Sequence, residues 1–289
     1  MKESDIIQPS KGTMYLVSTP IGNLNDITLR AIETLKTVDK IYAEDTRTSL
    51  TLLKHYDINT PLHSYHKYNE NKRVNSIIEE LHQGLNLAII SDAGTPLISD
   101  PGESLVKAAI QENIMITHIP GATAFVSGLI LSGKETQPFL FYGFLPTKHS
   151  ERENVLKKLL ELPYTLVFYE APHRIHDTLK SFKKIFKERN FSIIREITKL
   201  YESATHYSLS EIDQVPKLKG EIVLVFEGNH TKTQFTLDDL VDHIKLNIDD
   251  GLSEMDAIKK VSKARKMKKN DVYMAFQNYK KNQRSDSNG

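Results

Sequence analysis

The chain has 289 residues, of which 39% are hydrophobic and 26% charged, as in a globular protein long enough for two modest domains. It contains no cysteine, which excludes disulfides, zinc–thiolate sites, iron–sulfur clusters and cysteine nucleophiles. No apolar run reaches the length of a membrane-spanning helix, and residues 1–11 lack the apolar core of a signal peptide. We therefore expect a cytoplasmic protein with no membrane partner.

The net charge of +1 hides an uneven distribution of charge along the chain. Residues 254–284 contain ten Lys or Arg and three Asp or Glu, a net charge of +7, which leaves −6 for the rest of the chain. A basic segment on a mildly acidic body predicts a polyanionic partner. The alternative is a solvated helix face that has no partner.

The first half of the chain alternates short apolar runs with longer amphipathic ones. Runs rich in β-branched and aliphatic residues predict buried strands at 14–18, 40–44, 85–91 and 115–119. The segments between them have the apolar spacing of helices, at 28–38, 46–56, 68–82 and 103–112. Strands that alternate with helices indicate an α/β fold with a parallel or mostly parallel sheet.

The same pattern restarts after residues 119–121. Strands are predicted at 139–144, 165–169, 191–195 and 221–226, and helices at 152–162 and 173–188. Polar residues 229–234 mark a second boundary, followed by helices at 237–248, 255–265 and 271–281. We predict a disordered tail over 1–12, α/β domains over 13–119 and 120–233, and a basic helical region over 234–289, the last similar to a helix-turn-helix. Residues 283–289 are also predicted to be disordered.

The most informative motif is the loop over residues 91–102, SDAGTPLISDPG, which directly follows a predicted strand. Loops at the carboxyl ends of strands converge on the ligand crevice of open α/β sheets, and glycine lets the backbone approach a ligand closely. Asp92 can accept a hydrogen bond from a ligand hydroxyl or ammonium group. Two consecutive β-turns explain the same residues without a ligand, so the motif alone leaves both interpretations open.

Two further loops follow predicted strands in the same way. Residues 18–28, STPIGNLNDIT, lack Gly-x-Gly-x-x-Gly, so a dinucleotide cradle is not indicated. Asn25 or Asp26 is predicted to form a turn or to cap the helix that begins near Thr28. Residues 120–124, PGATA, place small side chains where a strand passes into a helix. Small side chains there allow a ligand to lie against the start of the helix.

Two apparent motifs are rejected. Residues 128–134, GLILSGK, match most of a phosphate-binding loop, but Glu135 replaces its magnesium-binding hydroxyl and no strand precedes it. The histidine pairs at 63 and 66 and at 173 and 176 have no third ligand nearby, so we predict no metal site. Carboxylates near strand ends can orient a substrate or act as a base, although caps and ion pairs explain each of them singly: Glu44, Asp45, Glu170, Glu196, Glu202 and Glu221.

Taken together, the motifs are more specific than any one of them. They occur in the order STPIGNLNDITLR (18–30), AEDTR (43–47), SDAGTPLISDPG (91–102), PGATA (120–124), GFLP (143–146), FYEAPHR (168–174), REITK (195–199) and KGEIV (219–223). This succession, which spans about Thr13 to Tyr279, resembles the 16S ribosomal RNA cytidine 2′-O-methyltransferases of the tetrapyrrole methylase superfamily. The first loop, TPIGNL at 19–24, departs from the Gly-x-Gly-x-Gly of the tetrapyrrole enzymes, which fits a change of acceptor. A second departure, Ala122-Thr123 in place of Pro-Ser or a similar pair, affects only fine contacts.

The resemblance implies two α/β domains of the tetrapyrrole methylase type with S-adenosylmethionine in the cleft between them, and a small C-terminal helical region. It also implies a homodimer that methylates a cytidine ribose in 16S rRNA or the 30S subunit by in-line transfer, without a metal. Carried over position by position, the implied cofactor-binding residues are Pro20, Asp92, Ala93, Gly94, Thr95, Pro96, Ile98, Ala122, Thr123, Ala124, Tyr169 and Gly220.

The chemistry of the implied reaction suggests further candidates. A ribose hydroxyl is a weak acid, so a nearby base or hydrogen-bond acceptor helps as its proton leaves, and we hypothesise that Glu44 or Asp45 has this role. RNA affinity rests largely on neutralising phosphates, and the candidate contacts are Arg47, Arg174, Lys199, Lys263, Arg265, Lys268 and Lys269. Two alternatives stay open: a tetrapyrrole or other small acceptor, against which the basic tail and the first loop argue, and a non-catalytic RNA-binding or assembly factor.

Overall fold

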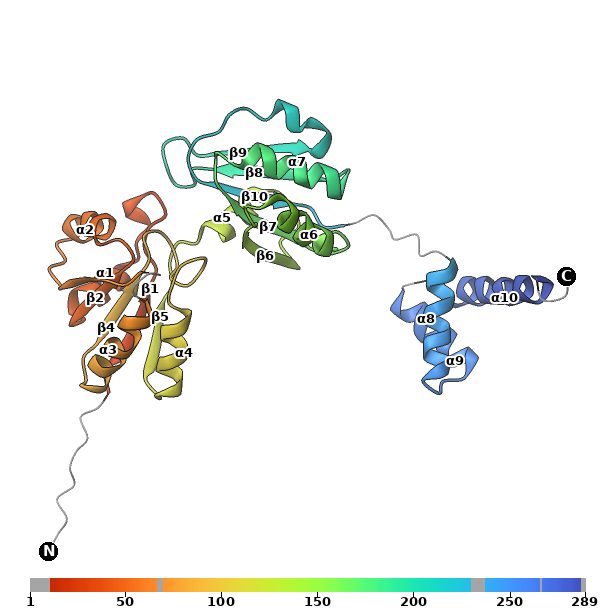
Figure 1. The fold of residues 1–289 in the computed structure, drawn as a ribbon, viewed down its shortest axis with the longest axis horizontal. Coiled ribbons are helices and arrows are strands. Elements are labelled where there is room, and N and C mark those ends of the chain that lie inside the picture. The colour runs from red at the N-terminus through yellow and green to blue at the C-terminus, as the bar shows by residue number, and fades with distance from the viewer. Residues whose placement is uncertain (1–10, 67–69, 230–236, 266, 287–289) are drawn as a thin grey trace, which may run out of the picture. The chain divides into compact units, whose positions relative to one another are not determined.

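The computed structural model describes residues 11–66, 70–229, 237–265 and 267–286 (Figure 1). The chain divides into two units, Met1–Gly228 and Asn229–Gly289. The predicted tail over 1–12 therefore lies outside the described residues except for Lys11 and Gly12, and so does the predicted boundary at 229–234 except for Asn229. Across the described residues, no helix combines the length and the apolar character that crossing a membrane requires.

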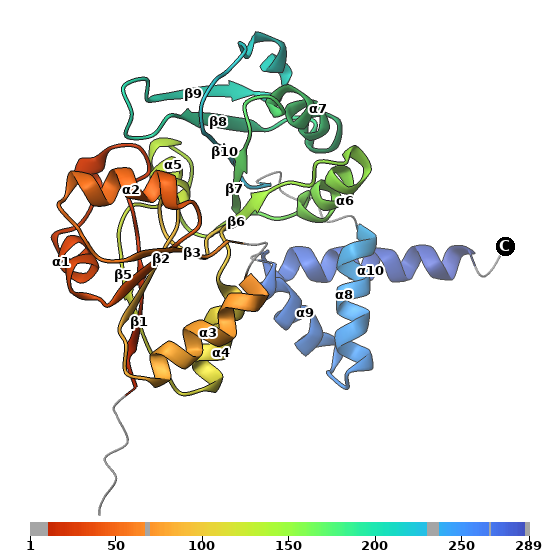
Figure 2. The same ribbon diagram turned by 60° about the vertical axis from the view of Figure 1, so that its left-hand side comes forward.

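The first sheet has five parallel strands in the order β3-β2-β4-β1-β5 (Figures 1 and 2). Its strands are β1 (Thr13–Val17), β2 (Lys40–Ala43), β3 (Leu62–Ser64), β4 (Leu87–Ile90) and β5 (Met115–Ile119). Its helices are η1 (Leu24–Asp26), α1 (Leu29–Thr37), α2 (Thr46–His55), α3 (Glu70–His82) and α4 (Glu103–Gln111). The parallel sheet predicted from the sequence is confirmed here.

Helices cover both faces of this sheet because its strands are apolar on both faces. In β4, Leu87 and Ile89 pack with α3 and α4, whereas Ala88 and Ile90 pack with α1 and α2. The helices that follow the adjacent strands β1 and β4 therefore lie on opposite faces of the sheet. The loops after these two strands diverge at such a point and open a crevice at the carboxyl edge.

The second sheet is mixed, in the order β6-β7-β10-β8-β9, and only β6 and β7 are parallel. Its strands are β6 (Phe139–Phe144), β7 (Thr165–Glu170), β8 (Asn190–Arg195), β9 (Ser203–Ser208) and β10 (Ile222–Phe226). Its helices are α5 (Ala124–Leu131), α6 (His149–Leu159), α7 (Ile175–Phe186) and η2 (Leu209–Gln214). The mostly parallel arrangement expected from the restarted pattern is wrong beyond β7, because no long helix follows β8 or β9 to carry a parallel crossover.

Two strands were missed in the sequence. β3 has three residues and pairs with Ile41–Ala43 at one edge of the first sheet. β9 forms an edge of the second sheet, and its sequence SATHYS is mostly polar. Neither is long or apolar enough to show a strand period, and both depend on pairing with a partner elsewhere in the chain.

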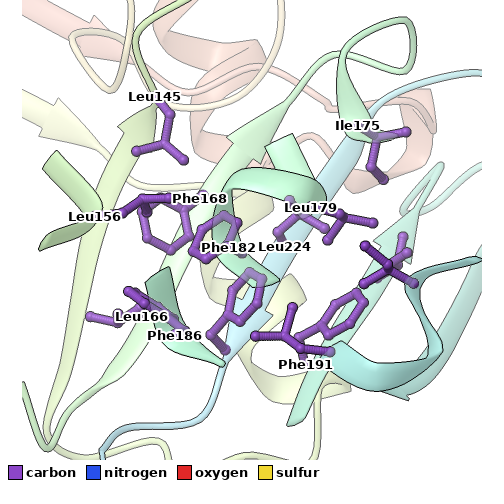
Figure 3. Close-up of a cluster of buried hydrophobic side chains, with 14 of the residues drawn as sticks. Leu145, Leu156, Leu166, Phe168, Ile175, Leu179, Phe182, Phe186, Phe191 and Leu224 are labelled. Atoms are coloured by element: carbon purple, nitrogen blue, oxygen red, sulfur yellow. The ribbon is translucent and has the colours of Figure 1, made fainter. Parts of the chain in front are cut away.

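The core of the second sheet is rich in phenylalanine (Figure 3). Phe182 of α7 stacks on Phe226 of β10 with ring centroids 3.9 Å apart, and its ring meets that of Phe168 edge to face. The opposite face of the sheet packs against α5. Ile21, from the loop after β1, belongs to the same cluster, together with Leu129. The first loop and α5 therefore tie the first sheet to the second.

The C-terminal unit contains α8 (Leu237–Asp249), α9 (Glu254–Ala264) and α10 (Lys269–Asp286), each in contact with the other two. Its core is formed by apolar side chains from all three helices, among them Ile244, Ile258 and Phe276. Because α10 continues to Asp286, the disorder predicted for 283–289 is wrong for 283–286, whereas 287–289 lie outside the described residues.

The contact between α5 and β10 depends on the absence of a side chain at Gly128. A Cβ at this position would lie 2.6 Å from Val223 Cγ1 and 2.9 Å from Val223 Cβ, closer than packed atoms approach. We expect Gly128→Ala to lower the free energy of unfolding of the full chain by about 1–3 kcal/mol in urea titrations, despite the better helix propensity of alanine. Val126→Ala, at an exposed position of the same helix, is the matched control. A Gly128→Ala variant as stable as this control would contradict the prediction.

Candidate active site

Three loops meet at the carboxyl edge of the first sheet. Thr19 and Gly94 exchange two backbone hydrogen bonds, of 2.8 and 3.1 Å, which join the loop after β1 to the loop after β4. The Thr95 hydroxyl lies 3.0 Å from Ser18 Oγ and 2.7 Å from Thr123 Oγ1, and it donates to the Ala122 carbonyl at 3.2 Å. The three small-residue motifs of the sequence are thus held together by direct contacts.

The loop after β4 has an unusual backbone. Leu97 and Ser99 have φ of 70° and 71°, a backbone conformation that residues other than glycine rarely adopt, and Gly94 and Gly102 are also at positive φ. Backbone strain of this kind persists only where the surrounding structure enforces it, and it concentrates at functional sites.

A cavity of about 380 Å³ opens beside these loops. From the first sheet it is lined by Ile21, Ala93, Gly94, Thr95, Ile98, Ser99 and Asp100, and from α5 and the second sheet by Thr123, Ala124, Phe144, Tyr169, Glu170, Ala171, Pro172, Ile197, Gly220, Glu221, Ile222 and Val223. The Tyr169 hydroxyl accepts a hydrogen bond of 3.2 Å from the backbone N–H of Phe125, which fixes the start of α5 against β7. Burial raises the pKa of Tyr169 to about 12, so this hydroxyl stays protonated.

A larger cavity of about 760 Å³ adjoins the first, and the two share Ile21, Ala93 and Glu221. It is lined by Thr19, Pro20, Gly22, Leu24, Asp45, Arg47, Thr48, Ser49, Thr51, Leu52, Ser91, Asp92 and Lys199 as well. Of the cofactor-binding residues implied by the resemblance, seven line the smaller cavity alone: Gly94, Thr95, Ile98, Thr123, Ala124, Tyr169 and Gly220. Ala93 lines both cavities, Pro20 and Asp92 line the larger one, and Pro96 and Ala122 line neither.

Lys199 connects the second half of the chain to the first loop. Its ammonium group lies 3.1 Å from Glu196 Oε1 and 3.0 Å from Glu221 Oε2. A Cβ at Gly22 would lie 2.5 Å from Lys199 Cγ, so the aliphatic part of the lysine rests on this glycine. Two carboxylates thus neutralise the one ammonium group that borders the larger cavity.

The end of β2 and the loop after β4 bring four carboxylates close together. Asp45 caps α2 by accepting from the N–H of Arg47 at 2.9 Å, and its own N–H donates to Asp92 Oδ1 at 2.9 Å. Burial, together with the charges of Asp92 and Asp45, raises the pKa of Glu44, although His66 opposes the shift. Burial and the charge of Glu44 raise the pKa of Asp100 to about 6. Hydrogen bonds from Arg47 instead lower the pKa of Asp45 to about 2.

The candidate RNA contacts lie in three places. Arg47 and Lys199 border the larger cavity, and Arg47 pairs with Asp45 at 2.7 Å. Arg174 donates to the Leu145 carbonyl at 2.9 Å and lies outside both cavities. The others belong to α9, α10 and the turn between them: Lys263, Lys268 and Lys269 are exposed, and Arg265 is half-buried and bonds His243 at 3.1 Å. Within the described part of the chain, no three His, Asp or Glu residues are grouped to hold a metal ion.

Sequence reasoning overlooked several residues of the smaller cavity, notably Asp100, Phe144 and Ile197. Asp100 could have been found, because it lies in the Ser91–Gly102 motif, but there it looks like an ordinary turn residue. Phe144 and Ile197 come from strand ends of the second sheet, and no local signal shows that these ends face the first sheet.

Comparisons with known proteins agree with this architecture. The family model described as Tetrapyrrole (Corrin/Porphyrin) Methylases matches residues 13–213. The ribosomal RNA small subunit methyltransferase I of Halalkalibacterium halodurans is 44% identical over 274 residues, which cover 92% of this chain and 95% of that protein. A crystal structure of diphthine synthase matches 74% of this chain and 89% of its own with a TM-score of 0.61 at 12% identity. The uroporphyrin-III C-methyl transferase from Thermus thermophilus complexed with S-adenyl homocysteine matches 74% and 96%, with a TM-score of 0.53 at 16% identity.

The two solved structures establish the fold, since their sequence identity is too low to carry more. They confirm the α/β fold of the tetrapyrrole methylase type that the motifs predict. The family model covers most of the chain, and the relative covers nearly all of it at high identity. The chain is therefore a methyltransferase that belongs to the ribosomal RNA small subunit methyltransferase I family, within the tetrapyrrole methylases.

Proposed function

We propose that this chain transfers the methyl group of S-adenosylmethionine to the 2′-hydroxyl of a cytidine in the 16S rRNA of the small ribosomal subunit. One observation carries the proposal: a cavity of small-molecule size adjoins a larger one, and the two share Ile21, Ala93 and Glu221. A transfer reaction needs such a pair of sites, one for the donor and one for the acceptor. The name of the relative from Halalkalibacterium halodurans supplies the class of acceptor, ribosomal RNA.

The smaller cavity suits the donor. Its volume lies within the range of about 300–1,000 Å³ that small-molecule sites occupy, and Ile98 and Phe144 give it apolar walls for an adenine ring. Glu170 also lines it, and its buried Oε2 has no hydrogen-bond partner among the described residues. A carboxylate oxygen in this state suits a ligand hydroxyl or ammonium group. S-adenosylmethionine supplies a methyl group that is already activated on a sulfonium.

The larger cavity suits the acceptor nucleotide. Its walls combine acceptors on Asp45, Ser91 and Asp92 with the cations of Arg47 and Lys199. The task of these residues is to hold the 2′-oxygen in line with the methyl group and to keep water out, because orientation alone can supply much of the rate. The shared residue Ile21 presents an apolar side chain at the junction of the two cavities.

Glu44 and Asp45 differ in how each can assist the departing proton. Asp45 lines the acceptor cavity, but the low pKa that Arg47 gives it makes it a weak base and a good hydrogen-bond acceptor. Glu44 has a raised pKa and is the stronger base, yet it lines neither cavity. We propose that Asp45 accepts the hydrogen bond of the 2′-hydroxyl and thereby orients it, and that the negative charge of the adjacent Glu44 makes Asp45 a stronger acceptor.

The proposed function is tested by tritium transfer from labelled S-adenosylmethionine to small ribosomal subunits from a strain that lacks this protein, followed by nucleoside analysis. We expect the label in a 2′-O-methylated cytidine. Absence of label from the RNA, with S-adenosylmethionine nevertheless bound, would contradict the proposal and favour a small acceptor or an assembly factor.

Replacing either carboxylate by its amide should lower the single-turnover rate of methyl transfer. We expect losses of about 10²- to 10⁴-fold for Asp45→Asn and Glu44→Gln, with the Kd for S-adenosylmethionine nearly unchanged. Asparagine caps helices as well as aspartate does, so Asp45→Asn leaves the start of α2 intact. Glu33→Gln, at an exposed position of α1, controls for the loss of a surface charge. An unchanged rate for one amide variant removes that residue from the mechanism.

Donor binding should depend on pH through Asp100. This carboxyl group is neutral below its pKa of about 6 and negative above it, so affinity for the cationic S-adenosylmethionine should rise between about pH 5 and about pH 7. Asp100→Asn should flatten the curve measured by calorimetry, and the uncharged thioether product should show a weaker dependence. Equal pH curves for the variant and the wild type would refute the role of Asp100.

The free energy of unfolding should also fall as the pH rises from about 4 to about 6, because only the folded chain keeps the proton of the Asp100 carboxyl group in that range.

A further inference from the structure

A third cavity, of about 390 Å³, lies where α6 and α7 begin. It is lined by Thr147, His149, Arg152, Arg174, Asp177 and Lys180, none of which lines the two cavities of the active site. The helices α6 and α7 lie side by side (Figures 1 and 2), and residues near the first turn of each contribute to this cavity. Three of its six lining residues, Arg152, Arg174 and Lys180, are permanent cations.

Arg152 is the most unusual member of this cavity because its charge is buried without a counterion. The residue is 3% exposed. Its guanidinium donates to Ser181 Oγ at 3.0 Å and to the carbonyls of Thr147 at 3.2 Å and Asp177 at 3.4 Å, all of which are neutral acceptors. Among the described residues, no carboxylate oxygen lies within 4.0 Å of its guanidinium nitrogens. The carboxylates of Glu170, Asp177 and Glu153 pair instead with Arg174, Lys180 and Lys184. Because a buried charge is costly unless it is paired, an anion is the missing partner.

The neighbours of Arg152 add positive charge. Arg174 donates to Thr147 Oγ1 at 3.3 Å, and its Nε lies 3.5 Å from the buried carboxylate of Glu170 behind the cavity. Lys180 has a side chain that is 70% exposed, and it is only 3.9 Å from Asp177, the one carboxylate in the lining. Three permanent cations thus face one lining carboxylate, so the cavity keeps an excess of positive charge.

Both helices also present their amino-terminal ends to this cavity. The N-cap residues Lys148 of α6 and Arg174 of α7 make no capping hydrogen bond through their side chains. Backbone N–H groups of the first turns are therefore available to an acceptor, and the helix dipoles favour negative charge at this end. An arginine fork next to helix starts is an arrangement that suits the oxygens of a phosphate group.

We infer that this cavity binds a phosphate of the RNA backbone, at a site separate from the reacting nucleotide; the inference rests on the proposed function. Ala171 and Pro172 line the donor cavity, and Arg174 follows two residues later in the lining of the third cavity. One short segment therefore borders both sites, and an RNA strand that enters the active site can extend across it. The group recognised is a phosphate diester, held by Arg152, Arg174 and Lys180.

The test compares full-length variants in binding a fluorescent 16S rRNA fragment over a series of salt concentrations. Arg152→Gln and Lys180→Ala should each raise the Kd several-fold and reduce the slope of log Kd against log salt concentration by about one, the loss of one phosphate contact. Lys180 is exposed, so its variant removes charge without disturbing the core. Arg152→Lys should restore part of the affinity. Lys158→Ala, at an exposed position of α6 outside the cavity, is the matched control.

A second arm identifies the source of the phosphate. Inorganic phosphate titrated into the protein should shift the Nε–H nuclear magnetic resonance signal of Arg152, and the RNA fragment should displace it. Phosphate that RNA fails to displace, or variants with the affinity and salt slope of the Lys158→Ala control, would overturn the inference. Methyl transfer by the wild type is measured in parallel. If the wild type transfers the methyl group but the variants bind RNA normally, the cavity assignment alone is overturned. If the wild type itself transfers no methyl group, the result counts against the proposed function.

Discussion

Ile21, from the loop after β1, is 6% exposed and packs in one cluster with Leu129 of α5 and with Val167 and Val223 of the second sheet. Burial of such a side chain is worth about 1.5–3 kcal/mol, and here it joins a loop of one sheet to the core of the other. The same residue borders both active-site cavities. This contact between the two sheets therefore also fixes the spacing of the two cavities that we propose for donor and acceptor, and the proposed in-line transfer depends on that spacing.

The parts of the fold that could be predicted from sequence are those with a strong local signal. The strands Met115–Ile119 and Phe139–Phe144 were predicted with the bounds that the structure shows, because the first is rich in β-branched residues and the second in aromatic ones, and both types favour strands. The strand Ser203–Ser208 was missed because its place at the edge of the sheet is decided by pairing with β8. Gly94 and Thr95 of the candidate active site came from motifs, whereas the environments of Asp100 there and of Arg152 in the third cavity depend on residues distant in sequence, which no local pattern reports.

Two carboxylates adjacent in sequence acquire different properties here, one through its hydrogen bonds and the other through burial and neighbouring charges. Asp45 begins a helix and accepts from Arg47, so its charge is stabilised. Glu44, one residue earlier, is half-buried next to Asp92, so its charge is opposed. Glu44 directly follows the buried end of strand β2, whereas Asp45 is the N-cap of α2, and this difference in position separates the two environments. Two carboxylates that are adjacent in sequence, Glu44 and Asp45, thus have pKa values shifted in opposite directions in the structure.

The same charges place a limit on how this protein can bind RNA. Glu44, Asp45, Asp92 and Asp100 lie close together at the active site and would repel a polyanion if they stood alone. The nearby cations cannot compensate fully, because Arg47 is paired with Asp45, and Lys199 is shared between Glu196 and Glu221. Net attraction must then come from cations that have no carboxylate counterion, such as Arg152 of α6, whose hydrogen-bond acceptors are all neutral. In the arrangement that we propose, a basic phosphate site separate from the acidic reaction site allows carboxylates to serve the chemistry without abolishing affinity for the substrate.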